Sequence, residues 1–94
     1  MAVFSPVNSV LSTSQALTPV AVATITSAEQ TFTVTGLTTS MAVLSVRPAV
    51  AQTAGIGLTG ARVSATDTLA LTFTNPTAGS LTPVASTYTI VVQA

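Results

Sequence analysis

Acidic and basic groups that could carry out catalysis are nearly absent from this chain. Of its 94 residues only Glu29, Arg47, Arg62 and Asp67 carry a formal charge, and there is no lysine, histidine or cysteine. General acid–base catalysis needs a group that titrates near the working pH, or two carboxyl groups with separated pKa values. The nineteen threonine hydroxyls have no neighbouring base to activate them as nucleophiles. The sequence therefore predicts that the protein is not an enzyme.

The glycines in residues 55–60 form the one pattern that suggests a ligand site, a phosphate-binding loop. Their spacing, GIGLTG, differs from the GxGxxG motif, and neither a lysine nor a helical pattern follows. We interpret the segment as a flexible loop. Zinc sites need Cys or His ligands, and a calcium site needs more oxygen ligands than two carboxylates provide. No cofactor, metal or small-molecule substrate is therefore expected.

The charged shell that keeps ordinary soluble domains apart is missing. About a quarter of the residues of an average domain are charged, whereas here the fraction is 4% and the net charge is zero. Such a surface is expected to be covered by a partner. Arg47 and Arg62 are either simply solvated or donate hydrogen bonds to carboxylates and carbonyls of that partner. Two arginines do not make the basic patch that nucleic acid requires, so nucleic acid is not expected to be the partner.

The hydrophobic fraction of 48% raises the question of a membrane protein. The longest apolar stretches, residues 19–23 and 41–44, are far shorter than the roughly 18 residues that a spanning helix needs. A transmembrane barrel would need longer alternating strands with aromatic girdles, and this chain has one tyrosine and no tryptophan. The first ten residues show neither a basic region nor an uninterrupted apolar core. We expect neither membrane insertion nor a secretory signal.

The elements that carry these residues are expected to be strands. Most threonines alternate with Val, Ile, Leu and Phe, a pattern of period two that favours strands over helices. Gly, Pro and Asn separate the alternating segments. The sequence predicts an all-β fold, a small antiparallel β-sandwich or barrel of about six strands. The residues that mark these strands are Val20, Val22 and Thr24; Phe32 and Val34; Ala42, Leu44 and Val46; residues 61–65; Leu69, Leu71 and Phe73; and Tyr88, Ile90 and Val92.

The first 18 residues lack this period, and we divide the chain into an extended N-terminal arm, residues 1–18, and a single β domain, residues 19–94. The arm carries Val3, Phe4, Val7 and Val10, which makes it more apolar than a disordered tail. It is either a frayed terminus or an arm that becomes ordered on a neighbouring subunit. If the strands begin only at Val20, removing the arm leaves the sheet folded.

One hairpin can be given a register from the sequence. Residues that pair across an antiparallel ladder share a face, so Val63 opposite Leu69 and Ala61 opposite Leu71 would put all four on the buried side. This register leaves residues 65–67 as the loop and places Arg62 on the outer face. The last loop position of such a hairpin needs a left-handed backbone, which Asp tolerates. Asp67 is therefore predicted to be a turn residue.

The core is expected to be too thin for a stable monomer. Apolar residues are mostly small, with fifteen alanines and thirteen valines against four aromatic residues. A chain of this length buries only about 60–65% of its unfolded surface, and no disulfide or zinc site adds stability. Burial against other chains is the remaining source of stability. We expect a homo-oligomer, a dimer or trimer.

The second half of the chain resembles small virion proteins of tailed phages. The resemblance rests on residues 55–58, 61–65, 67–75, 81–83 and 87–89, and on residues 34–38 upstream, and covers roughly residues 30–92. It implies a β-rich structural module, a capsid cement or decoration protein that binds major capsid protein. Such a protein would be made in the host cytoplasm and located in the phage head. The interface candidates are Val3, Phe4, Val7, Val10, Arg47 and Arg62.

Three other functions stay open. A tail, baseplate or spike component would use the same sheet at another position in the particle. A host-surface adhesin would be expected to expose Tyr, Trp or a charged pocket, and this chain has one tyrosine. An ice-binding protein would stack Thr-x-Thr motifs at a fixed short period. Such motifs occur here, for example at Thr72 and Thr74, but without a fixed period.

Overall fold

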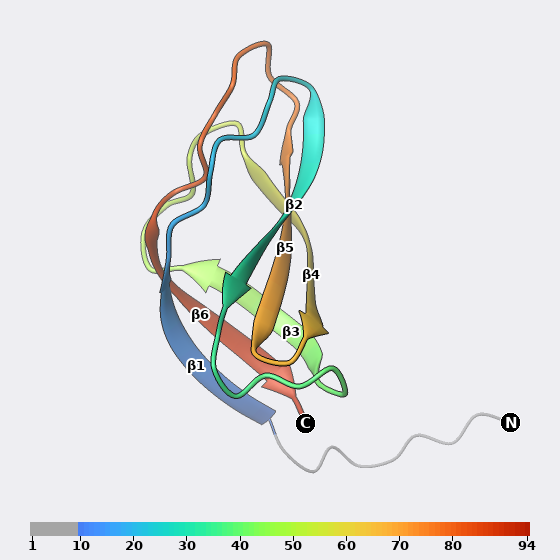
Figure 1. Cartoon of the computed structure of the whole chain (residues 1–94). Helices are drawn as coiled ribbons and strands as arrows, with labels where there is room; N and C mark the ends of the chain where they lie inside the picture. Colours follow the sequence, from blue (N-terminus) through green and yellow to red (C-terminus); the bar gives the residue numbers. More distant parts are fainter. Residues whose placement is uncertain (1–9) are drawn as a thin grey trace, which may run out of the picture.

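The computed structural model describes residues 10–94, which form six strands and no helix (Figure 1). All strand pairs are antiparallel. The all-β prediction with six strands is therefore confirmed. The strands are β1 (Val10–Leu17), β2 (Thr26–Thr33), β3 (Ala42–Pro48), β4 (Gly57–Ala65), β5 (Thr68–Asn75) and β6 (Ser86–Gln93).

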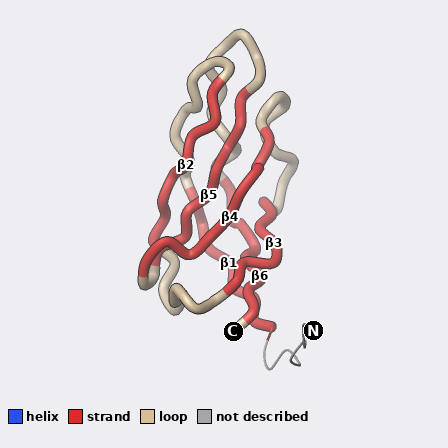
Figure 2. The backbone as a smooth tube through the Cα atoms, turned by 90° about the vertical axis from the view of Figure 1, so that its right-hand side faces the viewer, coloured by secondary structure: helices blue, strands red, loops and turns tan. Residues whose placement is uncertain are grey.

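The strands form two three-stranded sheets, ordered β1–β6–β3 and β2–β5–β4. The sheets lie face to face as a small sandwich (Figures 1 and 2), and they approach each other along β3 and β4. The chain passes repeatedly from one sheet to the other, so only β4 and β5 are neighbours in both sequence and sheet. Most strand pairing therefore joins segments that are distant in the chain.

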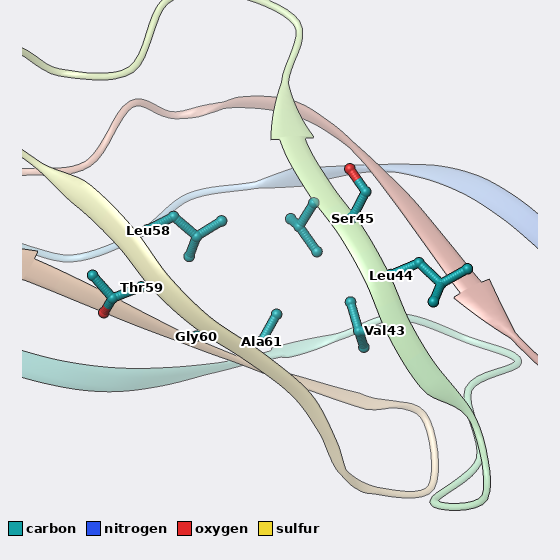
Figure 3. A pocket seen from close by; sticks show the side chains of 8 residues that line it. Val43, Leu44, Ser45, Leu58, Thr59, Gly60 and Ala61 are labelled. Atoms are coloured by element: carbon teal, nitrogen blue, oxygen red, sulfur yellow. The ribbon is translucent and has the colours of Figure 1, made fainter.

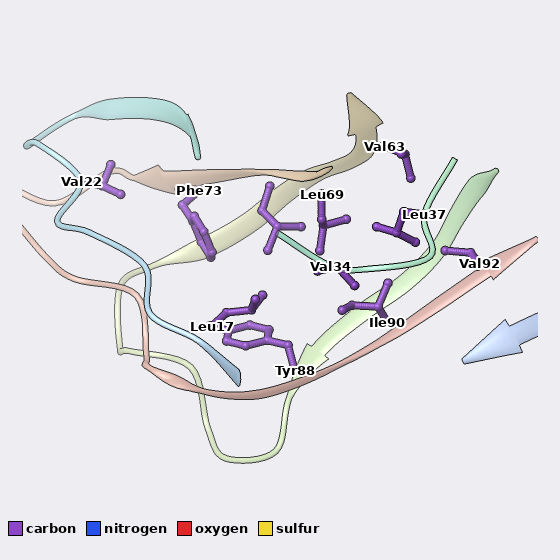
Figure 4. Close-up of a cluster of buried hydrophobic side chains, with 11 residues drawn as sticks. Leu17, Val22, Val34, Leu37, Val63, Leu69, Phe73, Tyr88, Ile90 and Val92 are labelled. Carbon is purple, nitrogen blue, oxygen red and sulfur yellow. The ribbon is translucent and has the colours of Figure 1, made fainter. Parts of the chain in front are cut away.

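The central strands β5 and β6 supply most of the core. Leu69, Leu71 and Phe73 alternate along β5 and are buried. The side chains of Tyr88 and Ile90 on β6 face those of Phe73 and Leu69 (Figure 4). Each fully buried side chain of this kind contributes about 1.5–3 kcal/mol of transfer free energy. The two strongest alternating patterns in the sequence thus form the two halves of one core. The full cluster is Leu17, Val22, Val34, Leu37, Val63, Leu69, Leu71, Phe73, Tyr88, Ile90 and Val92.

The strand expected at residues 20–25 does not form, and this prediction was wrong. Only Val22 of this segment is buried, where it makes an isolated bridge with Leu81. The side-chain amide of Gln30 hydrogen-bonds both the N–H and the carbonyl of Val20, at 2.8 Å each. Ile25 has a left-handed backbone, with φ of 49°. The alternating residues thus belong to a connection that buries one side chain.

The first strand instead lies at Val10–Leu17 and pairs with β6 along its whole length. Its inward positions include Thr13 and Gln15, which hides the alternation in the sequence. An edge strand tolerates these polar residues because its inward side is largely exposed, and only Leu17 enters the core. The sheet therefore includes residues 10–17 of the segment expected to be an arm. Removing residues 1–18 would take away β1, so the expectation that the sheet folds without them is corrected.

The pattern expected for β3 is also corrected. Ala42, Leu44 and Val46 were predicted to share one face, but a β-bulge interrupts the ladder between Val43 and Ser45. A bulge adds one residue and shifts the alternation that follows it. As a result Val43 and Val46 pack against the core, while Leu44 is 52% exposed.

The predicted hairpin register is confirmed. Val63 pairs with Leu69 and Ala61 with Leu71, although Ala61 is exposed because it lies beside the gap between β3 and β4. A register shift after Val63 shortens the connecting turn to Thr66 and Asp67. Asp67 has a φ of 57°, the predicted left-handed turn conformation. Residues 57–60 belong to β4, so their interpretation as a flexible loop is wrong.

Candidate interaction surface

The outer face of the β1–β6–β3 sheet is, within residues 10–94, a regular surface without an acidic group. Successive side chains of a strand point to opposite faces. Because Tyr88, Ile90 and Val92 point into the core, the residues between them point outward, as do their paired neighbours on β1 and β3. We call this set the outer face. It consists of Ser12, Ser14, Ala16, Ser45, Arg47, Thr87, Thr89 and Val91.

The outer face is small in side-chain size and nearly neutral. Apart from Arg47 it carries only hydroxyl, methyl and isopropyl groups. Because the side chains are short, a partner surface can approach the backbone of the sheet closely. Arg47 is exposed and adds five N–H donors in a rigid planar group. The face therefore suits a β-rich partner that supplies acceptor groups near Arg47.

The opposite sheet carries an internal ion pair on its outer side. Arg62 on β4 donates two hydrogen bonds to Glu29 on β2, at 2.9 Å from Nε and 2.8 Å from Nη2. These hydrogen bonds, helped by the guanidinium charge, hold the pKa of the Glu29 carboxyl below its usual range. The two charges thus neutralise each other across the intervening strand β5. Arg62 therefore has a partner within its own chain, although its side chain stays exposed.

Hydroxyl groups beside this ion pair also satisfy one another. Thr74 shares hydrogen bonds with Ser27 at 2.8 Å and with Thr59 at 3.0 Å. The Thr59 hydroxyl also donates to the Thr72 carbonyl at 3.3 Å. Polar groups that already have partners inside the chain gain less from a new partner, because binding then has to replace existing hydrogen bonds. This sheet is accordingly the less suitable contact surface.

The predicted interface residues fall in three places. Val3, Phe4 and Val7 lie outside the described residues. Val10 begins β1 and is 59% exposed. Arg47 lies on the outer face, and Arg62 lies on the other sheet, so the fold does not bring the two arginines together. Val10 and Arg47 belong to the same sheet, on its two edge strands β1 and β3.

Between β3 and β4 lies an open hollow of about 360 Å³. Val43 on β3 and Leu58 on β4 lie on either side of it (Figure 3). Its lining contains no titratable group, and within residues 10–94 no three His, Cys, Asp or Glu side chains are grouped to hold a metal. The lining combines aliphatic side chains with polar groups, among them Ser45 and Thr59, so the hollow offers a mixed contact surface rather than a site for chemistry.

Asp67 was recognised as a turn residue, but its contacts could not be foreseen. Its Oδ1 accepts a hydrogen bond from the Gly36 N–H at 2.7 Å. Its own N–H donates to the Leu37 carbonyl, and its carbonyl accepts from the Val34 N–H. Asp67 therefore fastens the β4–β5 turn to the segment that follows β2. This role is structural.

A partly buried hydrogen-bond network around Tyr88 was not predicted from the sequence. The Tyr88 hydroxyl donates to the Val84 carbonyl at 2.7 Å and accepts from the Gln52 amide at 3.1 Å. The Gln52 side-chain oxygen in turn accepts from the N–H groups of Thr53 and Val84. The only sequence signal was a single tyrosine in an apolar strand, whose hydroxyl needs a partner when buried.

Comparison of the chain with protein-family models, curated proteins and solved structures found no match in any of the three. Within residues 10–94 there is no helix of the length and apolarity needed to cross a membrane. The interpretation of the surface therefore depends on its own chemistry.

Proposed function

We propose that the protein is a structural component of a tailed-phage particle, a capsid cement or decoration protein that binds major capsid protein. In this role it stabilises the shell by burying contact area, and it catalyses no reaction. The observation that carries the proposal is that the surface has almost no charge without a partner in its own chain. Glu29 and Arg62 pair with each other, Asp67 is bound to Gly36, and Arg47 is the one remaining formal charge in the sequence.

A sheet face with short side chains and a single charged group supports such a role on physical grounds. Desolvating charged groups costs free energy when a partner covers them, and hydroxyl and aliphatic groups cost far less. The outer face carries one charged group, Arg47, whose planar donor group is well suited to fixing the register against a carboxylate. The outer face is the surface that we assign to the shell. The apolar residues Val3, Phe4 and Val7 precede it in the chain and are proposed to contribute to the same contact.

The test compares particles that contain the protein with particles from which its gene has been deleted. We expect the deleted particles to release their genome at lower temperature, because each lost contact removes free energy that opposes the internal pressure. Adding back purified protein should restore the release temperature. Identical release curves would contradict a cement function and favour a tail, baseplate or spike component.

A pair of variants tests which of the two sheets contacts the shell. Ser45→Asp places a carboxylate on the outer face, and Thr33→Asp places one on the outer side of the other sheet, both at exposed positions. Exposed substitutions of this kind change folding stability by only about 0.5 kcal/mol. When added to deleted particles, the Ser45→Asp protein should not restore the temperature of genome release, whereas the Thr33→Asp protein should restore it. The opposite result would move the contact to the β2–β5–β4 sheet.

A further inference from the structure

The two sheets have four edges, and β1 differs from the other three. Its inner neighbour is β6, and no other strand of residues 10–94 pairs with its free side (Figure 1). An unpaired edge presents a row of N–H and C=O groups that can pair with another chain. Proteins commonly protect such edges with charges, prolines or bulges.

The other three edges carry these protective features. The β3 edge has the bulge near Leu44, the charge of Arg47 and the proline Pro48. The β4 edge has two register shifts and Arg62, and the β2 edge has Glu29. The β1 sequence, VLSTSQAL, contains no charge, proline or glycine, and its ladder with β6 has no shift. β1 is thus the one edge ready for strand addition.

We propose that β1 pairs antiparallel with β1 of a second copy across a two-fold axis. The two β1–β6–β3 sheets then join into one continuous sheet of six strands. This inference goes beyond the proposed function and does not depend on it. We assign the strand that pairs with β1 to a second copy for two reasons. Two identical strands in an antiparallel pair are related by a two-fold axis, the symmetry of a closed dimer. An uncharged strand also meets its copy without like-charge repulsion.

The geometry limits the register of this pair. A two-fold axis normal to the joined sheet keeps the inner faces of both copies on the same side. Residues directly opposite each other in an antiparallel pair also share a face. The axis must therefore pass between the two copies of one and the same residue. With Ser14 on the axis, Leu11 lies opposite the partner's Leu17, and Thr13 lies opposite the partner's Gln15. With Thr13 on the axis, Leu11 would face the partner's Gln15. Leu17 is buried in its own core, so the Ser14 register is selected because it keeps the exposed Leu11 away from the polar Gln15 of the partner.

The apolar surface near Leu11 supports the same contact. Leu11 is 46% exposed and borders a hollow of about 210 Å³ that Leu37, Met41 and Val92 also line. The inward side chains of the partner's β1 lie beside this hollow in the Ser14 register. Dimerisation thus covers exposed apolar area in addition to completing backbone hydrogen bonds.

Single cysteines test the register, because the native chain contains none. Opposite Cα atoms in an antiparallel pair are about 4.5–5.5 Å apart, within the range of about 4.4–6.8 Å that a disulfide spans. Ser14→Cys in the full chain should therefore give a covalent dimer on mild oxidation. Ser12→Cys is the matched control, since its two copies would lie four residues apart along the strands, about 13 Å.

The expected result is a disulfide-linked dimer for Ser14→Cys and none for Ser12→Cys on a non-reducing gel. Equal cross-linking of both variants, cross-linking of Ser12→Cys alone, or none in either would overturn the proposal. Light scattering gives an independent measurement. The native chain should have twice the monomer mass, and Ser14→Lys, which places two ammonium groups at the axis, should halve it. The exposed control Ser40→Lys should leave the dimer intact, and a native monomer or trimer would contradict the proposal.

Discussion

Asn75 offers the sharpest test of the packing that holds the sandwich together. Its side chain is fully buried. Its amide nitrogen donates to the carbonyls of Val22 at 3.1 Å and Gly79 at 2.8 Å. Its oxygen accepts from the N–H of Thr77 at 3.0 Å and from the Thr77 hydroxyl at 2.6 Å. One amide thus joins the end of β5 to the segment before β2 and to the β5–β6 connection.

The variant Asn75→Ala removes all four hydrogen bonds, but it leaves only one group without a partner. The Val22 carbonyl keeps its bond from Leu81 N–H, and the Gly79 carbonyl keeps its bond from the Thr77 hydroxyl. The Thr77 N–H, in a half-buried residue, loses its partner, and leaving such a donor unsatisfied costs up to about 1–3 kcal/mol. A chain of 94 residues is expected to have an unfolding free energy of about 5–14 kcal/mol. The variant should therefore fold, with that free energy lowered by about 1–3 kcal/mol.

The variant Asn75→Asp keeps the shape and adds a titration. An ionised carboxylate would face the carbonyl oxygens of Val22 and Gly79, and burial also disfavours the charge. Both effects raise the pKa of the new carboxyl in the folded state above its unfolded value of about 4. A raised pKa means that the folded state binds the proton more tightly. Relative to the native chain, the stability of Asn75→Asp should therefore be highest below about pH 4 and fall as the pH rises through the folded pKa.

Urea denaturation measures both variants, with the fluorescence of Tyr88, the only tyrosine in a chain without tryptophan, as the probe. The control is Ser80→Ala, which removes one long hydrogen bond of 3.3 Å to the same Val22 carbonyl and should change the midpoint little. A stability of Asn75→Ala within about 0.5 kcal/mol of the native chain would refute this description of the network. A pH-independent loss in Asn75→Asp would refute the assigned carbonyl contacts.

Three further results are expected. Asp67→Gly should lose the hydrogen bond to Gly36 but keep the left-handed turn, whereas Asp67→Ala should be about 1 kcal/mol less stable than Asp67→Gly in urea because alanine is strained there. Arg62→Gln should raise the pKa of Glu29 toward its usual range in an NMR titration. In the native chain the Glu29 ion pair stabilises the fold above the usual carboxyl pKa, and this contribution is lost as the pH falls through the lowered folded pKa; an unshifted titration of the variant would contradict the pairing. Tyr88→Phe, followed by circular dichroism, should cost up to about 1–3 kcal/mol because it leaves the half-buried Val84 carbonyl and Gln52 amide without the hydroxyl, and an unchanged midpoint would contradict that network.

The sequence was a good guide where side-chain period and burial agree. Leu69 and Phe73 in β5 and Ile90 in β6 alternate without interruption and are buried, because both strands are central and one side of each faces the core. Asp67 was predictable because few residues other than glycine tolerate a left-handed turn. These features depend on local chemistry.

The remaining features depend on contacts between distant segments. Nothing local distinguishes the bulge at Leu44 from a regular strand, and the alternation around Val22 is compatible with a connection that buries one residue. The Glu29–Arg62 pair arises because β5 lies between β2 and β4, an order that periodicity does not encode. The candidate surface was therefore predictable in its composition and not in its position.

The central claim, that this chain is attached to the shell of a phage particle, is tested most directly by cryo-electron microscopy of purified particles with and without the protein. The proposal predicts extra density on the outside of the shell, in contact with major capsid protein, that accommodates the six-stranded sandwich and is absent when the gene is deleted. Density confined to the tail, or identical maps of the two particles, would contradict it.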